Sequence, residues 1–198
     1  MRIYLLCDKP EMIKYWGYEF NSNRTMLDYK NTIIISNNSF YEFMKTFHDI
    51  EGIVSPANSF GYMDGGYDKA IIDYLGEQAQ TNVLTMLNSI TDGYQPVGTC
   101  IGIPFGKYTI LHTPTMRYPE EIIDPRVVFD CMLSVLKYCD KNNIKSVVIP
   151  AFGEGTGKVS KSEVAKYMAL AYSFHIQDKP KNIDWSFVRD LKQKLSRF

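Results

Sequence analysis

SPANSFGYMDGGYD, residues 55–68, and PAFGEGTGK, residues 150–158, are the two glycine-rich stretches that decide the expected fold of this chain. Each follows a short apolar run and precedes a stretch of helical periodicity, so each is predicted to be a loop that joins a strand to a helix. Glycine lets the backbone approach a ligand closely, and the helix that follows offers unpaired N–H groups at the positive end of its dipole. One glycine pair alone is more often just a tight turn. Two matched loops favour a ligand with more than one phosphate.

Strands and helices alternate on both sides of these loops. The apolar patterns predict strands at residues 3–7, 32–36, 52–54, 98–104, 108–114 and 146–149, with a hairpin connection at residues 105–107. They predict helices at residues 11–20, 39–47, 68–86, 124–139, 162–174 and 184–195. This alternation indicates an α/β fold. We expect a single domain over residues 1–175, which opens with a βαβ unit, and a C-terminal helical appendage over residues 176–198.

Composition narrows the class of partner. The 22 basic and 22 acidic side chains cancel, so no global field attracts nucleic acid or an anionic membrane, although a local basic patch stays open. No run of about 18 apolar residues is present, and the first residues reach the charged Asp8 too soon for a signal sequence. We therefore expect a soluble, cytoplasmic protein without a membrane partner; the oligomeric state is not predicted.

The cysteines and histidines of this chain do not have the sequence spacing that is typical of a metal site. The four cysteines show no C-x-x-C spacing and no neighbouring histidine, and the three histidines are widely separated: Cys7, Cys100, Cys131, Cys139, His48, His112 and His175. We expect neither a disulfide framework nor a metal site, and no cofactor.

Two common phosphate motifs fail in the second loop. The P-loop pattern G-x-x-x-x-G-K-S/T needs glycine where Phe152 stands and serine or threonine where Val159 stands. The dinucleotide fingerprint is incomplete and follows a late strand. Backbone donors over residues 153–157 remain, and such a nest can hold a diphosphate without lysine or metal. Lys158 either assists or is simply solvated, and the solvated interpretation is favoured.

The first loop carries two polar side chains with candidate roles. The Asn58 amide can hold two hydroxyls at once. Asp68 has two interpretations that the sequence leaves nearly even. As an acid at a helix start it stabilises the dipole, whereas as a catalytic group it would orient or activate water beside a bound sugar.

At this point the chain resembles the macrodomain family, whose members bind ADP-ribose and include enzymes of ADP-ribose 1″-phosphate processing. The family signature Val-Asn-Ala-Ala-Asn with a following glycine cluster is similar to Val54-Ser55-Pro56-Ala57-Asn58 and Asp64-Gly65-Gly66, and residues 150–155 resemble its phosphate loop. The resemblance covers roughly residues 32–174. It implies a three-layer α/β/α fold with a central mixed sheet.

The resemblance also implies roles for particular residues. Asn58 would bind the distal ribose, Gly65 and Gly66 would admit it, and Asp68 would assist attack of water at the anomeric carbon. The implied activity is metal-independent hydrolysis of an ADP-ribosyl ester or of ADP-ribose 1″-phosphate, and the implied partner is ADP-ribose or an ADP-ribosylated protein. The catalytic candidates are Asp68 and Asn58, and the ligand-binding candidates are Asn58, Gly65, Gly66, Tyr67, Gly153, Glu154, Gly155, Thr156, Gly157 and Asn38.

The chain departs from the family pattern in three places. The acid that binds adenine in the family falls near Asn37-Asn38-Ser39, where only amides and a hydroxyl are present. Ser55 replaces the asparagine that opens the signature, and Pro56 stiffens the turn. The last family strand is not predicted after Phe174, so the opening βαβ unit is an alternative source of that strand. A non-catalytic ADP-ribose reader or interaction module is therefore the alternative function.

Overall fold

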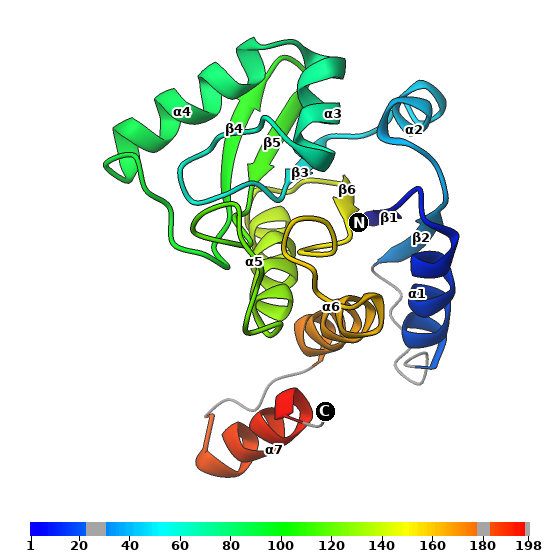
Figure 1. Cartoon of the computed structure of the whole chain (residues 1–198). Helices are drawn as coiled ribbons and strands as arrows, with labels where there is room; N and C mark the ends of the chain where they lie inside the picture. The colour runs from blue at the N-terminus through cyan, green and yellow to red at the C-terminus, as the bar shows by residue number, and fades with distance from the viewer. Residues whose placement is uncertain (23–30, 178–182, 197–198) are drawn as a thin grey trace.

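The computed structural model describes residues 1–22, 31–177 and 183–196 and has a mixed six-stranded sheet at its centre (Figure 1). The strand order is β2-β1-β6-β3-β5-β4. The strands are β1 (Arg2–Leu6), β2 (Thr32–Ser36), β3 (Gly52–Ser55), β4 (Ile101–Phe105), β5 (Tyr108–His112) and β6 (Ser146–Pro150). Among the strands of the described residues, only β4 runs antiparallel to its neighbour, as the first strand of a hairpin with β5, which confirms the predicted turn.

The opening βαβ unit belongs to the sheet itself. β1 pairs in parallel with β2 on one side, where Leu6 lies opposite Ser36, and with β6 on the other, where Leu6 lies opposite Pro150. The prediction that the opening βαβ unit can complete the sheet, in place of a strand after Phe174, is thus confirmed. Since β6 leads into the second glycine loop, the ends of β1, β2 and β6 meet at one edge of the sheet.

Helices cover both faces of the sheet and form the outer layers (Figure 1). One face carries α1 (Pro10–Ser22), α5 (Val127–Lys141) and α6 (Lys161–Ile176), and the other carries α2 (Phe40–Thr46), α3 (Gly66–Leu75) and α4 (Gln78–Ile90). Two buried apolar clusters, one on each side, hold the layers together, and each fully buried large side chain contributes about 1.5–3 kcal/mol. The three-layer α/β/α prediction is confirmed.

The long helix predicted over residues 68–86 is wrong, because the chain breaks it in two at Gly76. Gly76 adopts φ 93°, a backbone conformation that favours glycine, and its N–H donates to the carbonyl oxygen of Ile72 at 2.7 Å to close α3. α4 then starts at Gln78. Both helices turn apolar side chains to the same cluster, Ile72 from α3 and Val83 from α4 among them, so the apolar periodicity continues across the break.

The last helix, α7 (Trp185–Ser196), lies beside α6 at the end of the described chain (Figure 1). It has no fully buried residue. Its contacts with α6 include a hydrogen bond from the Tyr167 hydroxyl to the carbonyl oxygen of Leu195 at 3.3 Å and a ring contact between Phe174 and Phe187 at 6.0 Å. α7 is therefore attached to α6 through a small, largely apolar interface.

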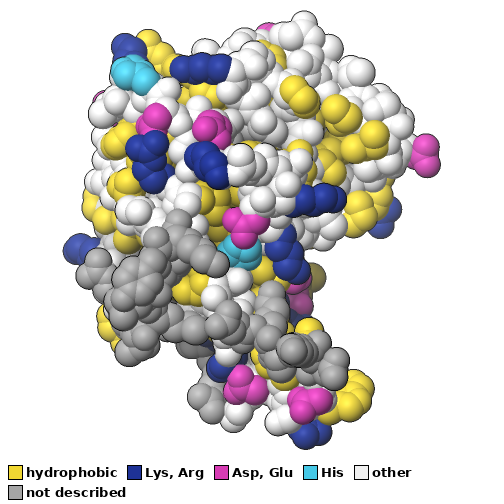
Figure 2. Space-filling model, turned by 180° about the vertical axis from the view of Figure 1, so that it is seen from behind, with side chains coloured by type: hydrophobic (Ala, Val, Ile, Leu, Met, Phe, Trp, Pro, Cys, Tyr) yellow, Lys and Arg dark blue, Asp and Glu magenta, His cyan; other side chains and the backbone are white. Residues whose placement is uncertain are grey.

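The surface shows mixed charge. Figure 2 shows the back of the molecule, where basic and acidic side chains are interspersed. Within the described ranges, no helix has the length and apolar character that crossing a membrane requires.

Candidate functional site

The first glycine loop begins as an extension of the pairing between β3 and β5. Beyond the strand ends, the Thr115 N–H donates to the Ala57 carbonyl oxygen at 3.2 Å, and the Ser59 N–H donates to the Met116 carbonyl oxygen at 3.0 Å. The segment after β5 therefore forms one wall of the site, and the loop after β3 forms the next.

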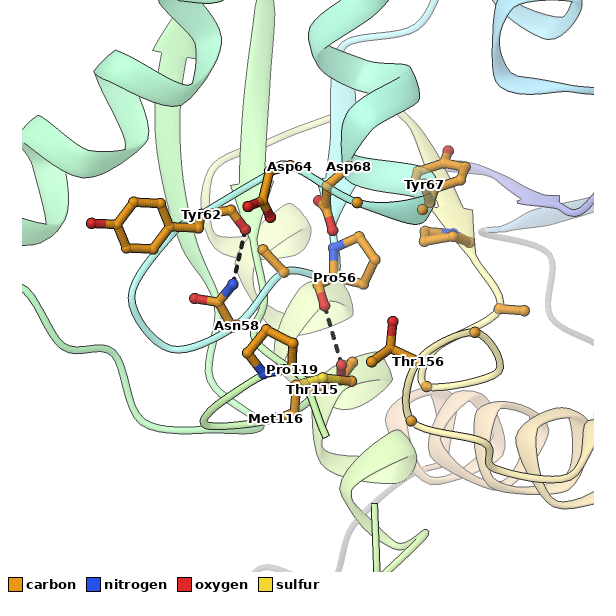
Figure 3. Close-up of a pocket in the computed structure, with 18 residues that line it drawn as sticks. Pro56, Asn58, Tyr62, Asp64, Tyr67, Asp68, Thr115, Met116, Pro119 and Thr156 are labelled. Carbon is orange, nitrogen blue, oxygen red and sulfur yellow. Dashed lines mark hydrogen bonds between the residues drawn. The ribbon is translucent and has the colours of Figure 1, made fainter. Parts of the chain in front are cut away.

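A first pocket of about 140 Å³ opens between these segments and the second glycine loop (Figure 3). It brings together most of the site residues predicted from the sequence: Asn58, Gly65, Gly66, Tyr67, Asp68, Gly153, Gly155, Thr156 and Gly157. Residues that the sequence did not single out complete the wall: Tyr62, Asp64, Thr115, Met116 and Pro119.

Asp68 lies in the first turn of α3 with only 8% of its surface exposed. The Ser55 hydroxyl donates a hydrogen bond to its carboxylate at 2.6 Å. Burial raises the pKa of Asp68 to about 7, with a further increase from the charge of Asp64 and an opposing effect of the Ser55 hydrogen bond. A carboxyl group with this pKa exists in both protonation states near neutral pH, which suits a general base or acid.

The Asn58 amide is already engaged by its own loop. Its Nδ2 donates to the Tyr62 carbonyl oxygen at 2.9 Å, as Figure 3 shows, and its Oδ1 accepts from the Phe60 N–H at 3.0 Å. An amide offers two N–H donors and two acceptor lone pairs, so one of each remains for a ligand. Asn58 therefore reaches the pocket in a fixed orientation.

The second loop is shaped by close backbone contacts. Gly153 has φ +72°, and a Cβ atom on Gly157 would lie 2.5 Å from Ile122 Cδ1 and 2.7 Å from the Gly153 carbonyl oxygen. No described residue accepts a hydrogen bond from the N–H groups of Gly155, Thr156 or Gly157. These groups are the donors that an anion would meet. Lys158, by contrast, points to the surface and forms an ion pair with Glu121.

A second pocket of about 420 Å³ adjoins the first where β1, β2 and β6 end. The two pockets share five wall residues: Gly66, Tyr67, Pro150, Ala151 and Gly155. We call the two together the double pocket. The two remaining predicted residues, Asn38 and Glu154, line the second pocket.

Glu154 is held by basic neighbours. Its carboxylate accepts from Lys9 Nζ at 2.7 and 2.6 Å, and Lys161 Nζ lies 3.7 Å away. The side chain thus ties the second loop to the segment after β1 and to the start of α6.

Sequence reasoning missed Asp8, Lys9 and Phe40 in the second pocket. Asp8 and Lys9 stand next to the end of β1, and only the strand order places that end beside β6 and the second loop. The role of Ser55 was also missed. In the sequence, Ser55 only lacks the amide of the asparagine that it replaces, and the structure is needed to place its hydroxyl beside Asp68.

His112 is a structural neighbour of the site. Its Nδ1 lies 2.6 Å from Gln95 Oε1, and burial lowers the pKa of the ring to about 4, so the ring is neutral at physiological pH. Among the residues that the structure describes, no three histidine, cysteine, aspartate or glutamate side chains are grouped as a metal ion would need.

Comparison with known proteins finds one family. A family model for the Macro domain matches residues 54–168. Uncharacterised proteins of Aquifex aeolicus and Aeropyrum pernix are 32% identical over 123 residues and 31% identical over 126 residues. These matches cover 61% and 62% of this chain, and 71% and 64% of the two relatives; the chain therefore spans less than two thirds of the second relative.

Solved structures show the same fold. The Oceanobacillus iheyensis macrodomain with ADP has a TM-score of 0.57 at 18% identity, over 74% of this chain and 83% of that chain. A mutant of that macrodomain solved with ADPR has a TM-score of 0.58 at 17% identity, over 74% and 84%. The macrodomain of Mycobacterium tuberculosis DarG has a TM-score of 0.55 at 18% identity, over 64% and 83%.

Proposed function

Because this chain belongs to the macro domain family, we propose that its double pocket binds ADP-ribose or a derivative and that Asp68 assists hydrolysis at the distal ribose. The observation that carries the proposal is the position of Asp68. A buried carboxyl with a pKa of about 7 lines the first pocket, whose opposite wall is a loop with free backbone N–H donors.

The shape of the double pocket supports a ligand with two ends joined by phosphates. The diphosphate would lie where the pockets meet, within reach of the Gly155 N–H. α3 also begins beside this point, and its N-cap Gly65 has no capping side chain, so the first N–H groups of the helix are open to an anion. The distal ribose would then contact Asn58, and the nucleoside end would occupy the second pocket.

The proposed reaction needs one ionised carboxylate and one water. Asp68 takes a proton from water while the water oxygen bonds to the anomeric carbon, and the bond to the leaving group breaks with its electron pair. The proton then passes to the leaving group. The Ser55 hydroxyl orients the carboxylate by donating to one oxygen and leaves the second oxygen for the water.

Calorimetric titration with ADP-ribose tests binding, and absence of heat at millimolar ligand would rule the proposal out. Turnover is tested with Asp68→Ala, which should keep binding and lose hydrolysis of an ADP-ribosyl ester. Asp73→Ala is the matched control, because Asp73 lies exposed on the same helix and outside both pockets. Equal turnover in Asp68→Ala and the control would remove Asp68 from the mechanism.

A non-catalytic reader is the second candidate function. The hydrogen bonds of Asn58 favour this function. Its amide uses one donor and one acceptor within its own loop, so the side chain is fixed in an orientation that suits ligand binding rather than catalysis. Measuring release of ADP-ribose from a modified carboxylate separates the two functions, because a reader binds ADP-ribose and releases none.

A further inference from the structure

A cluster of aromatic side chains lies at the surface beside the first pocket. Phe60 stacks on Tyr118 with ring centroids 5.5 Å apart and packs edge-on against Tyr94 at 5.7 Å. The guanidinium carbon of Arg117 lies 5.2 Å from the ring centroid of Tyr94 and 5.5 Å from that of Tyr118. Tyr118 nevertheless keeps 50% of its surface exposed. We call these four residues, together with Tyr62, the aromatic patch.

Backbone hydrogen bonds hold the segments that carry the aromatic patch. The Ser59 N–H donates to the Met116 carbonyl oxygen at 3.0 Å, and the Gln95 N–H donates to the Ser59 carbonyl oxygen at 2.9 Å. Each of these three residues is next in sequence to a member of the aromatic patch. The patch is therefore built on the same backbone framework as the first pocket.

The aromatic patch continues the wall of the first pocket at the end where Asn58 lies. Tyr62 lines this pocket, but its ring extends away from the cavity beside Asn58 and is 56% exposed (Figure 3). Met116 and Pro119, on either side of residues 117–118, line the pocket too. In the proposed function Asn58 contacts the distal ribose. We therefore expect the group attached to the anomeric carbon to leave the pocket beside the aromatic patch.

The charges around the aromatic patch disfavour nucleic acid as its partner. Within residues 58–64, 91–99 and 115–121, Arg117 is the only basic residue. The same segments contain exposed carboxylates at Asp64, Asp92, Glu120 and Glu121. A phosphate backbone needs several cations along its path, and these carboxylates would repel it.

The composition of the aromatic patch suits a polypeptide. Tyrosine and arginine are enriched among the side chains that contribute most to protein–protein binding. Arg117 forms no ion pair with any residue that the structure describes. Its guanidinium is held over two rings, so its N–H groups can take a carboxylate of a partner.

We propose that the aromatic patch binds the polypeptide that carries the ADP-ribosyl group, and that Arg117 pairs with an acidic side chain close to the modified residue. The inference rests on the proposed function, since it identifies the partner that is presented to the same pocket. The double pocket holds the ADP-ribosyl group, and the aromatic patch holds the chain to which that group is attached.

The test uses two peptides that carry ADP-ribose on one side chain through a hydrolysis-resistant linkage. The modified residue is flanked on both sides by aspartate in one peptide and by asparagine in the other. Calorimetry on the wild-type protein should show about fivefold tighter binding of the aspartate peptide, the size of a strong exposed ion pair. In Arg117→Gln the two affinities should differ by less than about twofold, and the affinity for free ADP-ribose should stay within about twofold of wild type.

Arg189→Gln is the matched control. Arg189 is exposed on α7 and lines neither pocket, so its substitution removes the same charge from another surface. It should leave the preference for the aspartate peptide unchanged. Tyr118→Ala provides a second variant, because it removes the exposed ring next to Arg117. It should weaken binding of both peptides and leave binding of free ADP-ribose unchanged.

A third probe is a single-stranded DNA oligonucleotide that carries ADP-ribose through the same linkage. We expect it to bind the wild-type protein no more tightly than free ADP-ribose does. Tighter binding of the oligonucleotide than of the aspartate peptide would assign the aromatic patch to nucleic acid and overturn the proposal.

Two further results would overturn the role of the aromatic patch while the proposed function stands. One is equal affinity of the wild-type protein for the two peptides, and the other is an unchanged preference in Arg117→Gln. Failure of free ADP-ribose and of both peptides to bind the wild-type protein would overturn both proposals.

Discussion

At the residue scale, Ser55 and Asp68 form the pair on which the proposed chemistry depends. The serine hydroxyl lies 2.6 Å from the carboxylate and stabilises its charged form, whereas burial destabilises that form. Burial is the larger effect, and the pKa therefore stays well above its ordinary value. The charged carboxylate of Asp68 therefore lowers the stability of the folded protein.

The raised pKa of Asp68 predicts how stability changes with pH. The unfolded chain releases this proton near pH 3.8 and the folded chain near pH 7, so the folded state binds more protons between these values. The free energy of unfolding should therefore fall as pH rises from about 4 to about 7. Asp68→Asn removes the effect and keeps an acceptor for Ser55. It should stabilise the protein by about 2–4 kcal/mol at pH 8, since one pKa unit corresponds to about 1.4 kcal/mol, and by much less at pH 4.

Urea unfolding of wild type and Asp68→Asn at pH 4 and pH 8 provides the measurement. Asp73→Asn serves as the control, because this substitution removes an exposed carboxylate from the same helix. An Asp68→Asn variant that is equally stable relative to wild type at both pH values would show that the buried carboxyl titrates normally.

Sequence reasoning located Asp68 but not Asp8. Asp68 is reached by local spacing, since the loop and the start of α3 are contiguous in the chain. Asp8 faces the second pocket only because β1 is inserted between β2 and β6, and this pairing depends on residues far apart in the sequence. Contacts within one loop can be read from a sequence, whereas the neighbours of a strand require the topology.

At the scale of single elements, the second loop is specified by glycines whose missing side chains leave room for its own backbone. Gly157 is the tightest case, because its added Cβ would meet both Ile122 and the Gly153 carbonyl oxygen. A flexible side-chain tip can move aside, but a backbone oxygen cannot move without shifting the loop. The free N–H groups therefore depend on this glycine for their positions.

Gly157→Ala should displace the loop, destabilise the protein by about 1–3 kcal/mol and weaken ADP-ribose binding several-fold. Thermal unfolding and calorimetry give the two measurements. Gly17→Ala is the control, since Gly17 lies within α1 with open space around its Cβ position and should gain about 0.5–1 kcal/mol without changing affinity. Unchanged affinity in Gly157→Ala would separate the second loop from ligand binding.

The break between α3 and α4 shows why element boundaries were harder to predict than element types. Residues on both sides of Gly76 turn apolar side chains to the same cluster, so the 3.6-residue period runs through the break without interruption. A glycine within a helical pattern is tolerated in many helices, and only its backbone angle decides the outcome. In the structure, local hydrogen bonds between Ser39 and Glu42 start α2 as a capping box.

At the scale of the whole molecule, α7 is the element most easily removed. It reaches α6 through partly buried side chains such as Leu191 and Leu195, and the residues described for it are absent from the walls of both pockets. We keep the division into a domain at residues 1–175 and an appendage at residues 176–198 as a proposal.

A chain that ends at Gln177 should therefore fold and bind ADP-ribose within about twofold of the full chain, because distant sites act independently. Its free energy of unfolding should fall by about 1–4 kcal/mol through loss of the partly buried side chains. Chemical unfolding and calorimetry on both lengths provide the comparison. Loss of binding in a well-folded shortened chain would show that α7 is part of the ligand-binding unit.

The position of β1 between β2 and β6 has a consequence for how the protein is made. β1 pairs on one side with β6, and most of the described chain is synthesised between these two strands. Until then one edge of β1 has no partner, and unpaired edges are prone to aggregate. Pairing of segments so distant in sequence also slows folding. Assembly of the double pocket is therefore a late event, completed only when the second glycine loop arrives.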